Sequence, residues 1–270
     1  MKMAATIYDT IGLGYRRHRR ADPHIAEHIF ARLGSAKSVL NVGAGTGSYE
    51  PADRKVIAIE PSEIMIGQRS QTCAPCIQAE SEALPFRDGA FDAAMAVLTV
   101  HHWSRLAEGL REMRRVARLK IVIVTWDPEC HEKFWLTRDY LPEILDHDRA
   151  RFPKLATLEE QLGPLDIGPL LIPHDCTDGF RGAYWRRPEA YLDSEIRQSI
   201  SSFSQLDSAV VEEAMSRLAA DLKSGAWACR NEGILSQEAA DLGYRIVRAC
   251  YNGGCGEERS HLHQPEGNES

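Results

Sequence analysis

The feature that most constrains the fold is a loop with three glycines at alternate positions, directly after a short apolar segment. Residues 38–42 (Ser-Val-Leu-Asn-Val) have the length and composition of a buried strand, and they lead into residues 43–47 (Gly-Ala-Gly-Thr-Gly). Glycine lets the backbone turn sharply and approach a ligand closely. In an open parallel sheet, ligands bind beyond the carboxyl ends of the strands, where such a loop lies. The pattern therefore predicts an α/β domain with a ligand site at this loop.

Further apolar segments alternate with helical patterns after the glycine loop. The expected strands are residues 56–60, a brief one from Ile77, residues 91–98 and residues 121–124. Ser62 is expected to cap a helix over residues 63–69, and Ser104 to cap one whose apolar positions are Leu106, Leu110, Met113 and Val116. Strands separated by helices predict a parallel sheet covered on both faces. Only residues 48–55, interrupted by Pro51, separate the glycine loop from the second strand. This connection therefore holds at most a turn or two of helix.

The rhythm of strands and helices changes after Pro128. Helical patterns dominate the following segment, and a final strand follows it. We divide the chain into an N-terminal helical lid (1–34), an α/β core that binds the cofactor (35–128), a helical cap or substrate region with one sheet strand near 169–174 (129–242), a final sheet strand (243–252) and a disordered tail (253–270).

Charge and composition narrow the partners. The formal net charge is −7, which argues against nucleic acid as the main partner despite the basic run at residues 16–20. No apolar run reaches the roughly 18 residues of a membrane helix, and no secretory signal is apparent, so the expected location is cytoplasmic and no membrane partner is expected. The seven scattered cysteines suit free thiols in a reducing compartment. The oligomeric state stays open, with a homodimer as one option.

An acidic residue strengthens the case for a ribose-bearing cofactor. Glu60 ends the second strand, where a carboxylate can accept hydrogen bonds from both ribose hydroxyls. The glycine spacing is G-x-G-x-G, whereas dinucleotide sites favour G-x-G-x-x-G. A nicotinamide or flavin cofactor is therefore the weaker interpretation.

Residues 39–103 resemble the class I S-adenosylmethionine-dependent methyltransferases of the type 11 branch. Four blocks match in the family's order, namely residues 39–47, 59–62, 80–86 and 91–92 leading to 97–103. The resemblance implies a Rossmann-like, mostly parallel seven-stranded sheet with helices on both faces and a helical cap insertion. It also implies S-adenosylmethionine as the cofactor.

The resemblance further implies which residues bind the cofactor. The glycine loop would pass beneath the methionine part, Glu60 would hold the ribose, and residues 80–82 would lie near the adenine. The implied set is Tyr15, Gly43, Ala44, Gly45, Gly47, Glu60, Pro61, Met65, Glu80, Ser81, Glu82, Val97 and Leu98.

Two adjacent histidines are the candidate catalytic residues. Methyl transfer from a sulfonium is an in-line displacement, and a base is needed only when the acceptor is a hydroxyl or a similar acid. His101 and His102 follow the fourth strand at the rim of the expected site, and imidazole has a suitable pKa. We predict a catalytic role for one of them, His101 slightly preferred; the alternative is a histidine that only hydrogen-bonds the loop. No metal site is predicted, because the Cys73–Cys76 pair has no second pair.

The expected function is methylation of a small-molecule acceptor, with oxygen favoured over nitrogen or carbon. One alternative is an enzyme of the same fold that binds the cofactor but catalyses a non-methylating reaction, such as a cyclisation. Another is a non-catalytic cofactor-binding protein, and an NAD enzyme is the third.

Overall fold

The structure is a computed structural model, which describes residues 19–254. Tyr15, most of the basic run, the first half of the expected lid and nearly all of the expected tail lie outside the described residues.

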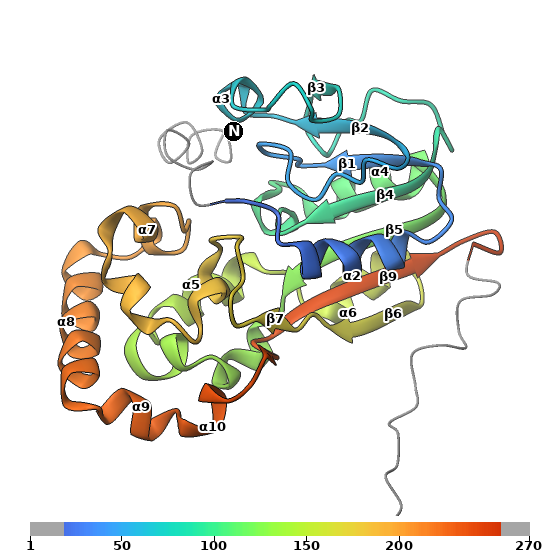
Figure 1. The fold of residues 1–270 in the computed structure, drawn as a ribbon. Helices are drawn as coiled ribbons and strands as arrows, with labels where there is room; N and C mark the ends of the chain where they lie inside the picture. Colours follow the sequence, from blue (N-terminus) through green and yellow to red (C-terminus); the bar gives the residue numbers. More distant parts are fainter. Residues whose placement is uncertain (1–18, 255–270) are drawn as a thin grey trace, which may run out of the picture.

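A seven-stranded sheet organises the described part of the chain (Figure 1). The strand order is β3-β2-β1-β4-β5-β9-β6, and every neighbouring pair is parallel except those formed by β9. The bounds are β1 (Ser38–Val42), β2 (Lys55–Glu60), β3 (Cys76–Gln78), β4 (Phe91–Val97), β5 (Ala117–Trp126), β6 (Leu165–Pro169) and β9 (Tyr244–Cys250). The expected mostly parallel, seven-stranded sheet is confirmed.

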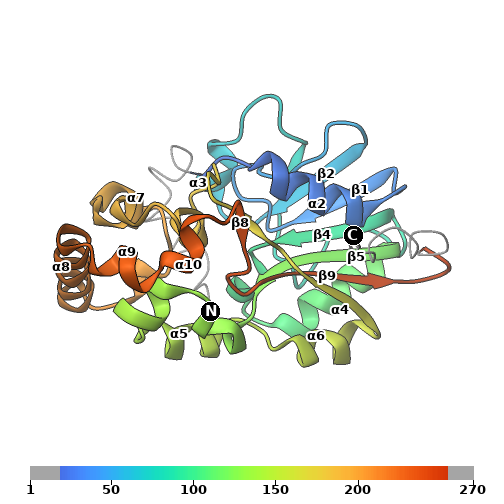
Figure 2. The same ribbon diagram turned by 60° about the horizontal axis from the view of Figure 1, so that its bottom comes forward.

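Helices cover both faces of this sheet (Figure 2). The bounds are α2 (Pro23–Leu33) on one face and α4 (Leu106–Val116) and α6 (Leu155–Leu162) on the other. Successive strand side chains point to opposite faces, so Val39 joins the cluster under α2 while Leu40 joins the cluster under α4 and α6. The apolar positions expected for the 106–116 helix are buried or half-buried, as predicted.

Several local expectations need correction. Ser104 does not cap α4, because its hydroxyl donates to Glu82 Oε1 (2.8 Å) and Arg105 is the residue preceding the helix. α3 (Glu63–Gly67) does begin at Ser62, whose hydroxyl accepts from the Met65 N–H (3.3 Å), but it ends two residues early. The short connection before β2 contains turns and no helix, in agreement with its length.

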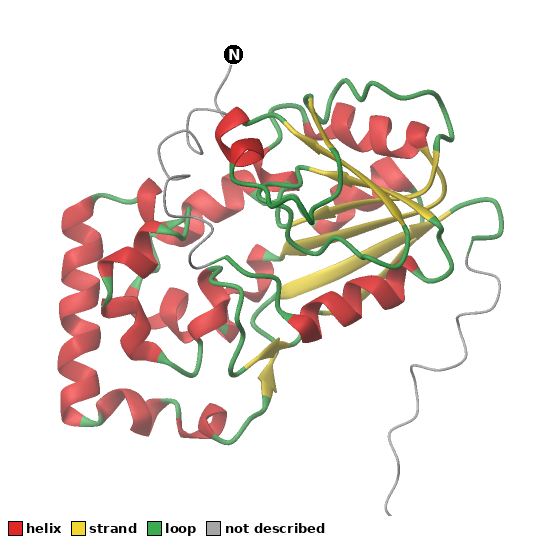
Figure 3. Ribbon diagram, turned by 45° about the horizontal axis from the view of Figure 1, so that its top comes forward, coloured by secondary structure: helices red, strands yellow, loops and turns green. Residues whose placement is uncertain are grey.

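The cap is built from two separate segments of the chain. The first contains the short 3₁₀ helix η2 (Pro128–Lys133), the π-helical turn η3 (Leu136–Tyr140) and α5 (Ile144–Arg151). The second contains η4 (Arg181–Tyr184), η5 (Pro188–Leu192), α7 (Ser194–Gln198), η6 (Phe203–Gln205), α8 (Ser208–Ser224), α9 (Ala226–Arg230) and α10 (Glu232–Leu235). These helices gather beside the strands rather than over them (Figure 3).

The strand expected near residues 169–174 is misplaced. The strand that joins the main sheet is β6, at Leu165–Pro169, where it pairs with β9. β7 (Ile172–Pro173) instead pairs with β8 (Ala239–Ala240) in a separate two-stranded sheet. Both are so short that tertiary packing, and not local propensity, decides where they pair.

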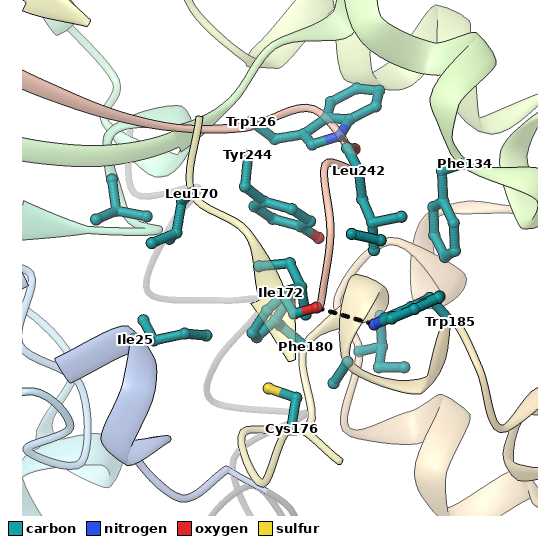
Figure 4. Packing of buried hydrophobic residues seen from close by; sticks show 14 of the residues in the cluster. Ile25, Trp126, Phe134, Leu170, Ile172, Cys176, Phe180, Trp185, Leu242 and Tyr244 are labelled. Atoms are coloured by element: carbon teal, nitrogen blue, oxygen red, sulfur yellow. Dashed lines mark hydrogen bonds between the residues drawn. The ribbon is translucent and has the colours of Figure 1, made fainter. Parts of the chain in front are cut away.

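Buried aromatic side chains join the cap to the sheet (Figure 4). Trp126 ends β5 and donates from Nε1 to the Leu242 carbonyl (2.8 Å), and Tyr244 begins β9. From the cap, Trp185 donates to the Ile172 carbonyl (3.1 Å), the bond drawn in Figure 4. One continuous apolar cluster therefore runs from the α2 face of the sheet into the cap and fixes the cap in place.

Three further observations concern membrane segments, metal sites and cysteines in the described residues. Within residues 19–254, no helix combines the length and apolarity needed to span a bilayer. The same range holds no group of three metal-ligating side chains. Cys73, Cys76, Cys130, Cys176 and Cys229 are free thiols, but Cys250 is disulfide-bonded. The expectation of free thiols throughout is therefore wrong at Cys250.

Candidate active site

A cavity of about 360 Å³ lies at the carboxyl ends of β1, β2 and β4. This is the edge at which open parallel sheets bind ligands. The sequence-predicted residues that line it are Gly43, Ala44, Gly45, Glu60, Pro61, Met65, Glu80, Ser81, Glu82, Val97, Leu98 and His102. Gly47 and His101 are not in its lining.

The glycine loop needs glycine for both conformation and space. Gly43 has φ of +72°, and a Cβ there would lie 2.1 Å from Thr99 Oγ1. Gly47 has φ of +96°, and its Cβ would lie 2.5 Å from Cys73 Sγ. Gly43 therefore lets the loop pass close to the end of β4, while Gly47 packs the loop against the α3–β3 connection, away from the cavity.

Glu60 is the buried acid of the cavity, with 5% of its surface exposed. The backbone N–H of Gly45 donates to its Oε2 (2.7 Å) and that of Ser62 to its Oε1 (3.0 Å). Burial raises the pKa of Glu60, and these two N–H groups, with Arg69, partly oppose the rise. Each carboxylate oxygen has two acceptor sites, so both can still accept a hydrogen bond from a ligand.

A buried ion pair, which the sequence analysis did not predict, supports the glycine loop. Arg69 donates to Glu50 Oε1 (2.7 Å), to the Gly45 carbonyl (3.2 Å) and to the Ala74 carbonyl (2.9 Å). Glu50 also accepts from Asn41 Nδ2 (3.2 Å). Both charged side chains are at least nine-tenths buried. The pair stabilises the short connection between β1 and β2, which has no helix although crossovers between parallel strands usually contain one. Nothing in the local pattern distinguishes Glu50 from a solvated carboxylate.

Glu82 connects two parts of the cavity wall. Its carboxylate accepts from the Ser81 hydroxyl (2.7 Å), the Ser104 hydroxyl (2.8 Å) and the Arg105 N–H (3.0 Å). Burial would raise the pKa of Glu82, but these hydrogen bonds outweigh it and leave the pKa lowered. Glu82 thus holds the start of α4 beside the cavity.

The end of β4 directs the chain toward the histidines. Leu98 has φ of +51°, which is unusual for a residue with a Cβ and marks a backbone held by its surroundings. Its N–H donates to the Val124 carbonyl (2.9 Å) of the neighbouring strand. The 3₁₀ helix η1 (Val100–His102) follows directly and carries both histidines to the rim.

A second cavity, of about 60 Å³, adjoins the first. The two share Arg19, Leu98 and His102 in their linings. The remaining lining residues come largely from the cap. They are His101, Asp148, Arg151, Phe152, Phe180, Arg181, Ile200, Ser201, Ser202, Gln205 and Tyr244. His102 therefore lies at the junction of the two cavities, whereas His101 lines only the second cavity.

Arginines surround the histidine pair. Arg151 donates from Nη2 to His102 Nδ1 (3.1 Å), and the His101 ring lies 3.9 Å from His102 and 4.1 Å from Phe152, centroid to centroid. The pKa of His102 is lowered to about 3, mainly by burial and further by the positive charges of Arg151 and Arg19. The pKa of His101 is lowered well below its usual value, mainly by burial and further by His102 and the nearby arginines Arg151, Arg181 and Arg19. Both rings are therefore neutral at neutral pH.

The family model described as a methyltransferase domain matches residues 40–122. Among solved structures, a protein of Anabaena variabilis assigned as a methyltransferase of an antibiotic biosynthesis pathway is 33% identical, with a TM-score of 0.78, over 86% of this chain and 98% of that one. A phosphoethanolamine N-methyltransferase of Haemonchus contortus, solved with S-adenosylhomocysteine, shares the fold at 12% identity, with a TM-score of 0.54, over 93% of this chain and 60% of that one.

A curated relative is the malonyl-[acyl-carrier protein] O-methyltransferase of Erwinia pyrifoliae. It is 35% identical over 42% of this chain and 47% of its own length. The chain thus spans about half the length of this relative. The match of fold and sequence to the Anabaena protein extends over nearly that whole protein. The chain belongs to the class I S-adenosylmethionine-dependent methyltransferases of type 11, whose cofactor is S-adenosylmethionine.

Proposed function

We propose that the protein transfers the methyl group of S-adenosylmethionine to an oxygen atom of a small molecule. The observation that carries this proposal is the joining of the cofactor cavity to a second, arginine-lined cavity at Leu98 and His102. Arginine cations stabilise a developing or existing oxyanion and repel an ammonium substrate. The O-methylating relative from Erwinia supports the same choice.

The residues of the larger cavity fit S-adenosylmethionine. A buried acid faces the cavity at the tip of β2, where it can accept from the ribose hydroxyls, and a glycine loop allows close approach of the backbone. We assign Glu60 to the ribose, the 43–45 backbone with Val97 and Leu98 to the methionine part, and Met65 with residues 80–82 to the adenine. Gly47 acts through loop packing alone. When bound, the cofactor supplies an electrophilic methyl carbon.

The chain's own residues would then orient the acceptor and exclude water. His102 is better placed than His101 to lie near the reacting groups, because only His102 lines both cavities. A net charge of −7 and a second cavity of about 60 Å³ favour a small molecule over nucleic acid. The cytoplasmic location and the homodimer stay predictions.

The test combines product counting with product analysis. Purified protein is incubated with isotopically labelled S-adenosylmethionine and small-molecule extract of the source organism, and S-adenosylhomocysteine is counted against labelled product. One product per S-adenosylhomocysteine, with the label on oxygen by NMR, supports the proposal. A label on nitrogen or carbon overturns the choice of oxygen. Product formed without S-adenosylhomocysteine would indicate a non-methylating reaction.

A further inference from the structure

The second cavity contains an unbalanced positive charge. Arg19, Arg151 and Arg181 line it, against the single carboxylate of Asp148. Arg181 pairs with Asp148 (2.6 Å), and Arg19 pairs with Asp178 (2.5 Å) behind the lining. Among residues 19–254, Arg151 has no carboxylate within ion-pair distance. Asp148, the one carboxylate in the lining, is paired with Arg181, so an anion that enters this cavity would find in Arg151 a cation that forms no ion pair with any of the described residues.

Arg151 is nevertheless held in place. It ends α5, and its guanidinium donates to His102 Nδ1 (3.1 Å). A guanidinium has no acceptor, so Nδ1 must accept and the proton of the neutral ring is on Nε2. This bond uses one of the five N–H groups of Arg151 and leaves others for a ligand in the second cavity, beside His102, which lines both cavities.

A second observation also favours binding of a polar group in this cavity. Nδ1 of His101 is buried and has no hydrogen-bond partner in the described part of the chain. A buried polar atom without a partner has lost its hydrogen bonds to water and destabilises the folded protein. His101 lines the same cavity as Arg151, so a polar group bound there can supply the missing partner.

We propose that the methyl acceptor is a carboxylate and that Arg151 binds it beside His102. It follows that neither histidine acts as a general base. This inference rests on the proposed function. The carboxylate oxygen donates an electron pair to the methyl carbon, and the bond from that carbon to sulfur breaks with its electrons passing to sulfur. The products are a methyl ester and S-adenosylhomocysteine. No proton is released, so the step needs no base.

The surroundings of the histidines agree with a base-free step. A base would have to become an imidazolium beside Arg151 and Arg19, and the pKa of His102, lowered to about 3, shows how strongly the site opposes this. His102 instead positions Arg151. Phe152, Phe180 and Ile200 complete the lining and suit a compact hydrocarbon group attached to the carboxylate.

The first experiment tests binding, without turnover. Calorimetry on the protein saturated with S-adenosylhomocysteine compares benzoate with its neutral counterpart benzamide. We expect benzoate to bind at least about tenfold more tightly, and Arg151→Met to remove the difference. Arg149→Met, an exposed arginine on the same helix, is the matched control and should preserve it. Equal affinities of the two probes in the unaltered protein overturn the carboxylate assignment but leave methyl transfer to other acceptors intact.

The second experiment uses the chemistry of the product. After transfer from tritium-labelled S-adenosylmethionine to extract, alkali releases volatile methanol from methyl esters, whereas ethers and N- or C-methyl products retain the label. We expect the transferred label to be alkali-labile. A transferred label that resists alkali refutes the carboxylate while the methyltransferase function stands. Absence of any transfer, from a protein that binds S-adenosylhomocysteine, counts against the proposed function itself.

Two variants separate binding from base catalysis. Arg151→Met should reduce kcat/KM for ester formation by at least about 30-fold, the lower range for truncating one member of a buried charge pair, with S-adenosylhomocysteine affinity unchanged. His102→Asn keeps an acceptor for Arg151 but cannot serve as a base, so its rate should stay within about tenfold of the original with an unaltered pH profile. A larger loss in which His102→Asn removes an ionisation from the profile would identify a base and refute the proposal.

Discussion

Replacing Glu60 by glutamine tests where the ribose binds. In the structure both carboxylate oxygens already accept from the backbone, one from Gly45 and the other from Ser62. A glutamine side chain keeps one acceptor oxygen and places an NH₂ group against one of these N–H donors. The change therefore removes the charge and disturbs the glycine loop that lines the larger cavity.

The size of the effect follows from these contacts. A hydrogen bond to a charged group contributes about 1.5–3 kcal/mol, and a ribose offers two hydroxyls to the carboxylate. Even the loss of about 1.4 kcal/mol corresponds to a tenfold change in the dissociation constant. We therefore expect Glu60→Gln to weaken S-adenosylhomocysteine binding by at least about tenfold, and Glu60→Ala, which leaves both N–H groups without an acceptor, to weaken it further.

Calorimetry with S-adenosylhomocysteine measures this directly. Glu63→Gln is the matched control, because Glu63 is an exposed acid three residues later, in the first turn of α3. Its affinity should match that of the unaltered protein. If a folded Glu60→Gln protein bound the ligand within about twofold of the unaltered protein, the ribose would have to lie elsewhere and the assignment of the cavity would fail.

Three other changes probe the loop and the histidine. Gly43→Ala forces a Cβ to within 2.1 Å of Thr99 at a φ of +72° and should lower both the melting temperature and the cofactor affinity; an unchanged melting curve would contradict the required φ. Arg69→Met leaves the carboxylate of Glu50 buried without its partner and should cost about 3–5 kcal/mol in urea unfolding, partly recovered when Glu50→Gln is added. His102 has a folded pKa of about 3, below its unfolded value near 6.5, so stability present above pH 6.5 should fall on acidification toward pH 3, by up to about 1.4 kcal/mol per pH unit. His102→Asn should reduce that dependence in unfolding curves at pH 7 and 4.5, and an equal slope in both proteins would rule it out.

The lining of the larger cavity, which we assign to the cofactor, could be predicted because its signals are local. The strand that ends at Val42, the glycines after it and Glu60 all lie within about two dozen residues, and each carries its own physical reason. The parallel sheet then brings the tips of neighbouring strands to one edge without further information. The same argument located Val97 and Leu98, which end β4 at that edge.

The acceptor half could not be predicted in the same way. Arg151 and Arg181 reach the histidines from two segments of the cap, and Arg19 approaches from before α2. Charged residues at such positions look, in the sequence, like ordinary solvated residues. The pair His101 and His102 was visible, but whether carboxylates or arginines would surround it depended on the tertiary fold, and that difference decides whether the pair suits a base.

The proposed donor side of the site is therefore specified by residues close together in the sequence, and the proposed acceptor side by residues from distant segments. The donor side depends on backbone conformation at the strand tips, which few residues can satisfy, as the space at Gly43 shows. The proposed acceptor side depends on side chains of the cap, whose aromatic rings also pack on one another; Trp135, for example, packs on Tyr191 and Trp227 with ring centroids 5.7 and 5.2 Å away. Substitutions around Arg151 can therefore change the acceptor while the cofactor cavity keeps its shape, because the two cavities share only the Leu98–His102 junction and Arg19.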